Sequence, residues 1–422
     1  MTSEHPDDHR GAYVWIWLPG AVSPVVAGRL QRERDGGYAF TYGRSYLDRT
    51  EAISLFPDEL PLRPGVQRQR DDDLPPCLRD AAPDAWGRRV IVHRLTGQRG
   101  QAAARVELDE LTYLLESGSD RIGALDVQAS ASEYRAREAA PTSLDELADA
   151  AERLERGESL SPELALALQH GTSVGGARPK ALLSSESARR IAKFSTSTDL
   201  FNLVKAEYLA MRLASRVGLD VAPVALARAL NRDVLLIDRF DRRRTPAGWE
   251  RRLMLSALTL LGLRELEARY ASYEDLAHRV RRDFSDPRQT LEELYGRMVF
   301  NVLCGNTDDH ARNHAAFWDG QTYRLTPAYD LCPQLRTGGE ASQAMLLTGQ
   351  RRDSRLVTCL AAAPAFGLTH NQARGLIDHQ RATLDNAWDE VCDEAELSRA
   401  ERDTLWQRSF INPYCLEGYP AG

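Results

Sequence analysis

Residues 304–314 read Cys304-Gly305-Asn306-Thr307-Asp308-Asp309-His310-Ala311-Arg312-Asn313-His314, and residues 325–330 read Leu325-Thr326-Pro327-Ala328-Tyr329-Asp330. Asn313 comes five residues after Asp308, and Asp330 comes seventeen residues after Asn313. Phosphoryl transfer uses an aspartate that accepts the proton of the attacking hydroxyl, together with an asparagine and a second aspartate that hold Mg²⁺. The pattern therefore predicts Asp308 as a catalytic base, and Asn313 and Asp330 as metal ligands.

The spacing is that of a kinase catalytic loop, which is written Asp-x-x-x-x-Asn and is followed by a metal-binding aspartate beyond a short hairpin. Residues 314–318 and 322–325 are predicted to form two short strands around the turn Asp319-Gly320. Such a hairpin allows the three polar side chains to meet at one point. The usual His-Arg before the first aspartate and Phe-Gly after the second are absent, so the sequence is not that of an ordinary protein kinase.

A different class of site must be weighed at the same place. His310 and His314 are four residues apart and have acidic neighbours, so they could instead be ligands in a metal-dependent hydrolase. That alternative requires a helix through residues 308–314 and further ligands from elsewhere in the chain. An isolated Asp-x-x-x-x-Asn also occurs by chance in long proteins, so the kinase interpretation needs support from other segments.

The two segments resemble the HipA family of toxin serine/threonine kinases. The family loop is close to Thr-Asp-Gly-His-Ala-Lys-Asn and is followed by Tyr-Arg-Leu-Thr-Pro-x-Tyr-Asp, which residues 307–313 and 323–330 match closely. The resemblance implies an α+β, two-lobed protein-kinase-like fold with an N-terminal β-rich subdomain and a mostly helical C-terminal lobe. It also implies ATP and Mg²⁺ as cofactors.

Upstream segments supply the other parts of a kinase. Residues 170–180 contain a loop of small residues, in which backbone N–H groups can approach phosphate oxygens, although such a loop alone is more typical of a plain turn. Lys193 lies in a predicted strand at 190–194, and Glu207 lies in a predicted helix at 202–217, where it could pair with the lysine. Either residue alone would be read as a surface charge, and it is their order along the chain that favours a kinase.

The resemblance extends to these segments and assigns further residues. It implies that Ser173 is autophosphorylated, which would move its loop out of the nucleotide site, and that residues 238–240 lie along the adenine. Arg178-Pro179 replaces the Gln-Glu of the family, and proline supplies no N–H. The nucleotide-binding residues implied by the resemblance are Gly175, Gly176, Ala177, Arg178, Pro179, Lys180, Lys193, Asp238, Arg239, Phe240, His310, Ala311, Arg312, Asn313, Tyr329 and Asp330.

Asp309 stands where the family usually has glycine. A second carboxylate beside the base could raise the pKa of one member of the pair or recruit a cation. We expect this residue to modify the rate rather than abolish activity.

Composition and charge exclude several classes of protein. With 422 residues, 43% hydrophobic and 27% charged, the chain is long enough for two or three globular domains. It has no run of about 18 apolar residues and no apolar leader, so we expect a cytoplasmic protein without a membrane partner. Its six scattered cysteines favour reduced thiols. A net charge of −7 argues against a surface that binds nucleic acid over its whole extent.

Local patterns predict four regions along the chain. They are a disordered tail at 1–11, a β-rich subdomain with helices at 12–145, a small kinase lobe at 146–240 and a helical large lobe at 241–422. Ser143 and Glu146 have the form of a capping box that opens a helix to about residue 156. Strands are predicted at 13–18, 25–30 and 38–42, and further helices at 84–95, 108–115, 291–303, 371–392 and 398–410.

The sequence is best interpreted as an ATP- and Mg²⁺-dependent serine/threonine protein kinase. The resemblance implies that it is the toxin of a toxin–antitoxin module, that a DNA-binding antitoxin holds it and gives it only indirect contact with DNA, and that its protein substrate is an aminoacyl-tRNA synthetase. Two alternatives stay open. One is a nucleotide-binding corepressor subunit that acts with a DNA-binding antitoxin, and the other is the metal-dependent hydrolase.

Overall fold

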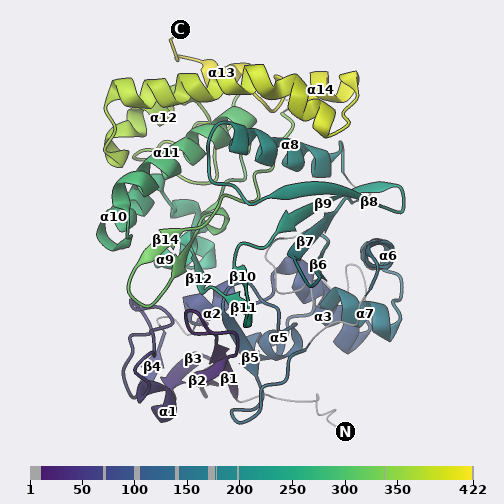
Figure 1. The fold of residues 1–422 in the computed structure, drawn as a ribbon, viewed down its shortest axis with the longest axis vertical. Helices are drawn as coiled ribbons and strands as arrows, with labels where there is room; N and C mark the ends of the chain where they lie inside the picture. Colours follow the sequence, from purple (N-terminus) through teal and green to yellow (C-terminus); the bar gives the residue numbers. More distant parts are fainter. Residues whose placement is uncertain are drawn as a thin grey trace.

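The computed structural model describes residues 11–69, 73–98, 105–137, 142–169, 176, 178–196, 199–336 and 338–420. The chain is a mixed helix-and-sheet protein with two lobes and an additional N-terminal subdomain, as the sequence predicts. Figure 1 shows the N-terminal sheet at one end of the molecule, a second sheet in the middle and a layer of C-terminal helices at the other end. The expected disordered tail lies outside the described residues, apart from Gly11, which begins the first strand.

The N-terminal subdomain is built on an antiparallel sheet of order β4-β3-β2-β1-β5. The meander predicted from the β-branched and aromatic runs is confirmed, and its inward positions on β1 alternate as Ala12, Val14 and Ile16, all fully buried. The strands are β1 (Gly11–Ile16), β2 (Val25–Arg32), β3 (Tyr38–Tyr42), β4 (Val66–Arg68) and β5 (Leu125–Gln128), and the helices are α1 (Arg44–Leu47), α2 (Pro76–Asp80), α3 (Ala85–Thr96) and α5 (Glu110–Glu116).

The middle sheet is antiparallel and has the order β6-β7-β9-β8. Val234 of β9 packs with Trp86, α6 and α7 on one face, whereas Leu235 packs with α8 on the other. Because both faces are covered, β9 is an apolar run rather than an alternating one. The strands are β6 (Lys180–Ser184), β7 (Arg189–Phe194), β8 (Val224–Ala229) and β9 (Arg232–Asp238), and the helices are α6 (Leu144–Glu155), α7 (Pro162–Gln169) and α8 (Leu203–Arg216).

The large lobe is mostly helical and carries a small sheet of order β12-β13-β14. The predicted hairpin around Asp319-Gly320 is confirmed as β13 and β14, whereas α14 ends at Leu405, before the predicted end at residue 410. The elements are β10 (Arg242–Thr245), β11 (Gly248–Arg251), β12 (Met254–Ser256), α9 (Ala257–Leu260), η2 (Glu265–Tyr270), α10 (Tyr273–Asp283), α11 (Pro287–Cys304), η3 (Ala311–Asn313), β13 (Ala315–Trp318), β14 (Tyr323–Leu325), α12 (Leu356–Ala362), η4 (Ala363–Phe366), α13 (His370–Glu394), α14 (Arg399–Leu405) and α15 (Pro413–Leu416).

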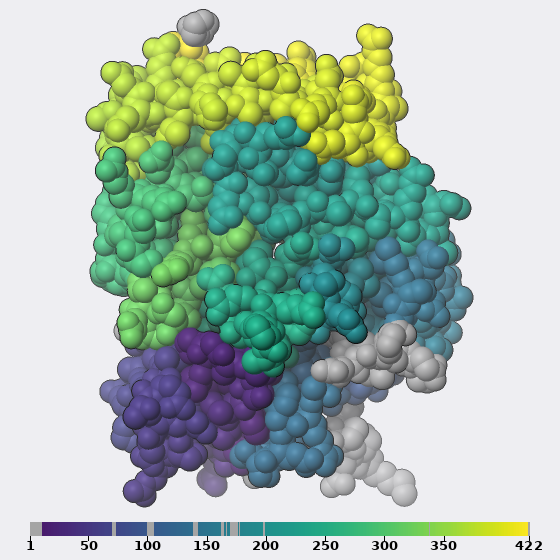
Figure 2. Space-filling view, viewed as in Figure 1, coloured from purple at the N-terminus to yellow at the C-terminus, as the bar shows by residue number. Residues whose placement is uncertain are grey.

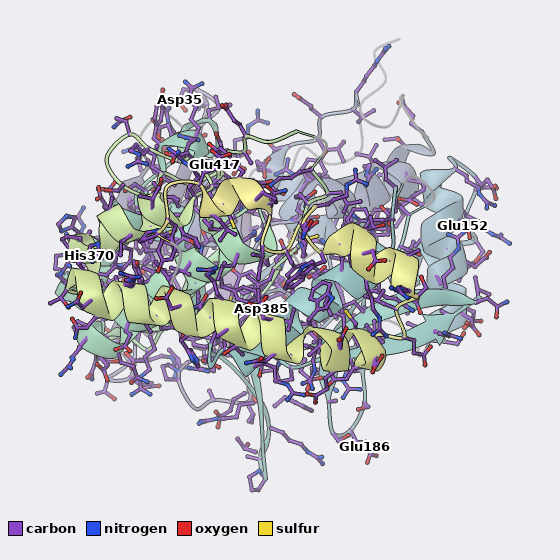
Figure 3. The ribbon with its side chains drawn as sticks, turned by 90° about the horizontal axis from the view of Figure 1, so that it is seen from above. Asp35, Glu152, Glu186, His370, Asp385 and Glu417 are labelled. Atoms are coloured by element: carbon purple, nitrogen blue, oxygen red, sulfur yellow. The ribbon has the colours of Figure 1, made fainter. Side chains whose placement is uncertain are left out.

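Helix α13 covers the outer side of the large lobe. Seen from above, it extends from His370 past Asp385 across the molecule (Figure 3). Its buried stripe includes Ile377, Leu384 and Val391, and these side chains belong to the same core as α8 and α11. Figure 2 shows this layer and the N-terminal subdomain at opposite ends of the molecule, with the teal and green atoms of the middle of the chain between them. Among the helices of the described residues, none is both long and apolar enough to cross a membrane.

A buried ion network joins the N-terminal subdomain to the connector that follows β9. Arg239 donates to both oxygens of Asp241, at 2.9 and 2.7 Å, and its Nη1 lies 3.0 Å from Asp120. Arg242 contacts the same two carboxylates. The guanidinium of Arg242 is therefore internal and is not available to nucleic acid.

Candidate active site

Lys193, Glu207 and Asp330 meet at the base of the middle sheet. The Nζ atom of Lys193 on β7 lies 2.6 Å from Oε1 of Glu207 on α8 and 2.5 Å from Oδ1 of Asp330, which follows β14. These residues are up to 137 positions apart in the chain. The lysine–glutamate pair proposed from sequence order is present, and the structure adds a direct contact between that lysine and the downstream aspartate.

Local structure explains why these side chains converge. Asn202 caps α8 by accepting from the backbone N–H of Lys205, which begins the helix so that Glu207 faces the sheet. Asp330 adopts a left-handed backbone conformation with φ of 58°. A non-glycine residue in this region is strained, and such strain is concentrated at functional sites.

Lys193, Glu207 and Asp330 shift one another's pKa values. Burial lowers the pKa of Lys193, but Asp330 and Glu207 outweigh that effect and raise the pKa above its usual range. Burial raises the pKa of Asp330, but the charge of Lys193 outweighs it and brings the pKa to about 2. Asp330 is therefore a carboxylate at neutral pH, as a cation ligand must be.

The catalytic-loop segment starts where α11 ends. Gly305 closes this helix with φ of 72°, and a Cβ atom there would lie 2.5 Å from the carbonyl oxygen of Ser409. Only glycine fits this turn. The side-chain amide of Asn313 donates to the carbonyl oxygen of Asp308 at 3.3 Å, so the two residues are joined across the loop.

The carboxylate of Asp308 makes no hydrogen bond to any residue that the structure describes, which leaves both oxygens open to a substrate. Burial raises the pKa of Asp308, His310 opposes the shift, and the charges of Asp330 and Asp309 add to it. A raised pKa makes this carboxylate a better proton acceptor than an exposed aspartate.

Asp309 is buried and bonded to two other side chains. Its charge raises the pKa of Asp308, but burial of Asp308 has the larger effect on that pKa. Its carboxylate accepts from Tyr273 Oη and lies 2.9 Å from His314 Nε2. Burial and the charge of Asp309 raise the pKa of Tyr273 well above its usual range, so this hydroxyl is a proton donor. Both oxygens of Asp309 are engaged, which argues against the expected recruitment of a cation.

The donor atoms of Asn313 and Asp330 suit Mg²⁺, whereas the geometry around His310 and His314 does not support the hydrolase alternative. Asn313 and Asp330 offer amide and carboxylate oxygens, which are hard ligands of the kind that Mg²⁺ prefers. Only residues 311–313 are helical between His310 and His314, as the short η3, and His314 belongs to the Asp309 network. Within the described residues, no three or more His, Cys, Asp or Glu side chains gather as a metal site.

The segment expected to lie along the adenine, residues 238–240, contains one aromatic side chain, that of Phe240. Phe240 packs against Tyr329, with ring centroids 5.5 Å apart, and the hydroxyl of Tyr329 donates to the carbonyl oxygen of Arg312. Asp238 forms an ion pair with Arg190 at 2.6 Å. The side chain of Arg239 is 1% exposed and is held in the connector network, so only its backbone could face a nucleotide.

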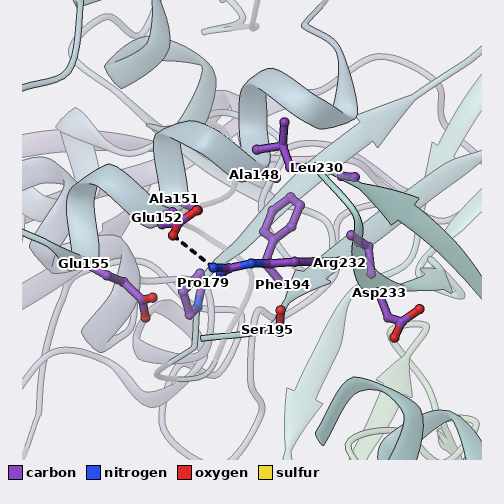
Figure 4. A pocket seen from close by; sticks show the side chains of 12 residues that line it. Ala148, Ala151, Glu152, Glu155, Pro179, Phe194, Ser195, Leu230, Arg232 and Asp233 are labelled. Atoms are coloured by element: carbon purple, nitrogen blue, oxygen red, sulfur yellow. Dashed lines mark hydrogen bonds and ion pairs between the residues drawn. The ribbon is translucent and has the colours of Figure 1, made fainter. Parts of the chain in front are cut away.

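The structure corrects part of the expected phosphate loop. Lys180 is the first residue of β6 rather than a loop residue, and it lies opposite Lys193 in the sheet, so the two lysines share one face. Pro179 instead lines a hollow against α6 together with Phe194, on the other face (Figure 4). The ring of Pro179 therefore does not face Lys180 and Lys193.

The remaining expected loop residues divide into two groups. Gly176 is described and has φ of 101°, and Arg178 forms an ion pair with Asp199 beyond β7. Ser173, Gly175 and Ala177 lie outside the described residues.

The three catalytic-loop residues expected to contact the nucleotide, His310, Ala311 and Arg312, lie in different surroundings. Ala311 is buried, so it could contact a nucleotide only through its backbone. Arg312 pairs with Glu265 of η2 at 2.5 Å, and His310 adjoins Asp308.

Two residues that contact the site were not predicted. Asp84 lies 3.3 Å from Nζ of Lys180, and its other oxygen caps α3 at the N–H of Gly87. Tyr273 holds Asp309 from α10. Neither lies near its partner in sequence, so no local pattern could have indicated these contacts.

Comparisons with known proteins match most of the chain. Residues 17–128 match the model of the HipA N-terminal domain, and residues 172–388 match that of the HipA-like C-terminal domain. Y4mE of Sinorhizobium fredii, named as a candidate kinase, is 27% identical over 338 residues, which are 75% of this chain and 76% of the relative. The serine/threonine-protein kinase toxin HipA of Shewanella oneidensis is 29% identical over 161 residues, 34% of this chain and 36% of the relative.

The fold also matches a solved structure. HipA of Shewanella oneidensis, solved in complex with HipB and its operator DNA, superposes with a TM-score of 0.71 at 20% identity. The match covers 95% of this chain and 99% of that one. This likeness establishes the overall architecture.

Proposed function

The chain belongs to the HipA family, and from this premise we propose that it is an ATP- and Mg²⁺-dependent serine/threonine protein kinase. The observation that carries the proposal is the convergence of Lys193 on β7, Glu207 on α8 and Asp330 in the segment after β14. The catalytic loop supplies the remaining two residues, Asp308 and Asn313, which are joined by the hydrogen bond from the Asn313 amide to the Asp308 carbonyl oxygen. Kinases named among its relatives support the same chemistry.

Each residue has one task in the proposed reaction. Lys193, steadied by Glu207, holds the α- and β-phosphates, and Asn313 and Asp330 hold Mg²⁺. The bound Mg²⁺ supplies positive charge that neutralises the transferring phosphate. Asp308 orients the acceptor hydroxyl and takes its proton, and its raised pKa suits that role.

We further propose that the kinase is the toxin of a toxin–antitoxin module. The support is a relative named as a kinase toxin and a structural neighbour solved with HipB and operator DNA. In this proposal a DNA-binding antitoxin holds the chain, which reaches DNA only through that partner. The proposed substrate is an aminoacyl-tRNA synthetase, Ser173 is the proposed autophosphorylation site, and the compartment is the cytoplasm, where its six free cysteines stay reduced.

The test is incubation with Mg²⁺-ATP, followed by intact-mass measurement and phosphopeptide mapping, for the wild type beside Asp308→Asn. We expect phosphate on the wild type alone, with Ser173 as the modified residue. Phosphate on a different residue would reject the assignment of Ser173 and keep the kinase. No phosphate on the wild type or on an added protein substrate would reject the kinase and favour a nucleotide-binding corepressor subunit.

A further inference from the structure

Three buried polar side chains, two of them from the catalytic loop itself, are in contact with one another. Tyr273 Oη donates to Oδ2 of Asp309, His314 Nε2 lies 2.9 Å from Oδ1 of the same carboxylate, and Tyr273 Oη and His314 Nε2 are 3.2 Å apart. Their exposed fractions are 0%, 1% and 2% for Tyr273, Asp309 and His314 respectively. We refer to Tyr273, Asp309 and His314 as the loop clamp.

The loop clamp closes the segment that carries the chemistry. Asp309 directly follows Asp308, and His314 directly follows Asn313. The contact between Asp309 and His314 therefore brings together the two ends of a six-residue segment, and each end adjoins the proposed base or the proposed metal ligand. The amide of Asn313 also donates to the carbonyl oxygen of Asp308.

The loop clamp is fixed to the rigid part of the large lobe. Tyr273 is the first residue of α10, and its hydroxyl accepts from the amide of Asn301 on α11 at 3.4 Å. Asn301 in turn accepts from Asn306 at 3.0 Å, and the carbonyl oxygen of Asn306 accepts from Gln343 at 3.1 Å. A chain of buried hydrogen bonds thus connects two helices to both ends of the loop.

A carboxylate buried this deeply carries a large desolvation cost, which only satisfied hydrogen bonds can offset. What the polar set adds is direction, because hydrogen bonds constrain both distance and angle, whereas apolar contacts are non-directional.

We propose that the loop clamp is a positioning device that sets the distance between Asp308 and Asn313, and that Tyr273, Asp309 and His314 are positioning residues for phosphoryl transfer. This inference rests on the proposed kinase function. It also accounts for the buried carboxylate of Asp309, which has Tyr273 and His314 as partners. Displacing reacting groups by about 1 Å costs roughly a hundredfold in rate.

The central experiment compares Tyr273→Phe with a matched control, Tyr295→Phe. Tyr295 is also fully buried and lies on α11, where its hydroxyl donates to the carbonyl oxygen of Cys359 at 3.1 Å, outside the loop clamp. Each substitution deletes one buried hydroxyl. We expect Tyr273→Phe to lower Tm more than Tyr295→Phe does, because it leaves the buried carboxylate of Asp309 one donor short. Only Tyr273→Phe should lower kcat, by roughly ten- to a hundredfold, with KM for ATP within about twofold of the wild type because the residues proposed to bind phosphate are untouched.

A second pair of variants tests the hydrogen bond at the other end. His314→Gln keeps an N–H that can donate to Asp309, whereas His314→Leu does not. The expected result is that His314→Leu loses roughly a hundredfold in kcat and that His314→Gln restores most of it. Equal losses in the two variants, or a kcat for Tyr273→Phe that matches Tyr295→Phe, would overturn the inference.

A failure of the kinase proposal is distinguishable from a failure of the loop clamp. If the wild type transfers no phosphate, the proposed function fails, and the loop clamp is then judged by hydrogen exchange at the backbone amides of residues 307–314. Faster exchange in Tyr273→Phe than in Tyr295→Phe would retain the loop clamp as a device that orders this segment. Equal exchange in the two variants would reject it.

Discussion

The ammonium of Lys193 lies 2.5 Å from the carboxylate of Asp330, so a proposed phosphate-binding group and a proposed metal ligand neutralise each other in the folded chain. Glu207 lies 2.6 Å from the same ammonium and is buried. Bound nucleotide and Mg²⁺ must therefore compete with an existing ion pair. The lysine serves the folded protein as well as the proposed reaction.

Removing this lysine is expected to affect both stability and turnover. Lys193→Met leaves two carboxylates without their cation, and we expect the free energy of unfolding to fall by about 2–4 kcal/mol, less than for a fully buried pair because Asp330 is partly exposed. Lys193→Arg keeps the charge and should recover most of the stability but little turnover, since a guanidinium cannot replace the compact ammonium. Urea unfolding and phosphate-transfer assays measure the two effects, and full turnover in Lys193→Arg would contradict the assignment.

Gly305 and Gly367 form a matched pair for testing the turn before the catalytic loop. Both have φ of 72°, but a Cβ atom at Gly305 would lie 2.5 Å from a backbone oxygen of Ser409, whereas nothing lies within 4 Å at Gly367. Gly367→Ala should cost only the backbone strain, about 1–2 kcal/mol. Gly305→Ala should cost at least about 2 kcal/mol more and should also lower kcat, because relieving the clash displaces the loop. Similar losses of stability in the two variants would show that the loop tolerates the shift.

Local patterns were sufficient to predict the elements that carry the site. Helical periodicity predicted α11, and the turn at Asp319-Gly320 predicted the hairpin of β13 and β14, so the spacing between Asp308 and Asp330 along the chain already implied that the two carboxylates approach each other. The pairing of Lys193 with Glu207 was predicted differently, from the order in which a kinase places a strand lysine and a helix glutamate along its chain.

Contacts between distant segments could not be predicted in this way. Lys180 was assigned to a loop because small residues precede it, but pairing with β7 extends β6 to that position. Arg239 was expected to lie along the nucleotide, although its guanidinium is bound by Asp120, which lies 119 residues earlier. Nothing in the local sequence around either residue encodes such a partner, since burial of a charge is decided by the element that packs over it.

The contact between Asp84 and Lys180 predicts how a ligand should affect stability. Asp84→Asn keeps an acceptor for the α3 cap but removes the charge beside Lys180, whose burial lowers its pKa and whose ammonium the Asp84 charge supports. Phosphate should then stabilise this lysine more than it does in the wild type. We expect the rise in Tm on adding Mg²⁺-ATP to be larger in Asp84→Asn than in the wild type.

Asp109→Asn is the control for this measurement. Asp109 also caps a helix of the N-terminal subdomain and forms an ion pair with Arg32 at 2.9 Å. None of its contacts involves Lys180 or Lys193. The rise in Tm that ATP produces should be the same in this variant as in the wild type. A rise in Asp84→Asn no larger than that of Asp109→Asn would show that Lys180 does not respond to phosphate.

The connector network predicts how stability depends on pH. Burial alone would raise the pKa of Asp241, but the guanidiniums of Arg239 and Arg242 outweigh it and hold the pKa below its usual range. A carboxylate whose pKa is depressed by folding stabilises the protein above its unfolded pKa, near 3.9, and this stabilisation is lost as the pH falls toward the folded value. Each such group adds up to about 1.4 kcal/mol of stability change per pH unit in that window.

Asp241→Asn isolates this contribution. At neutral pH the variant should be less stable by about 3–5 kcal/mol, because two buried guanidiniums lose a counter-charge. Below pH of about 4 its stability should fall less steeply than that of the wild type, by up to about 1.4 kcal/mol per pH unit, whereas between pH of about 6 and 8 the two slopes should agree, since Asp241 is ionised in both states there. Urea midpoints measured across this range provide the comparison. Parallel curves below pH of about 4 would mean that the carboxylate takes up its proton equally in the folded and unfolded chains, and that its ion pairs do not hold the connector to the N-terminal subdomain.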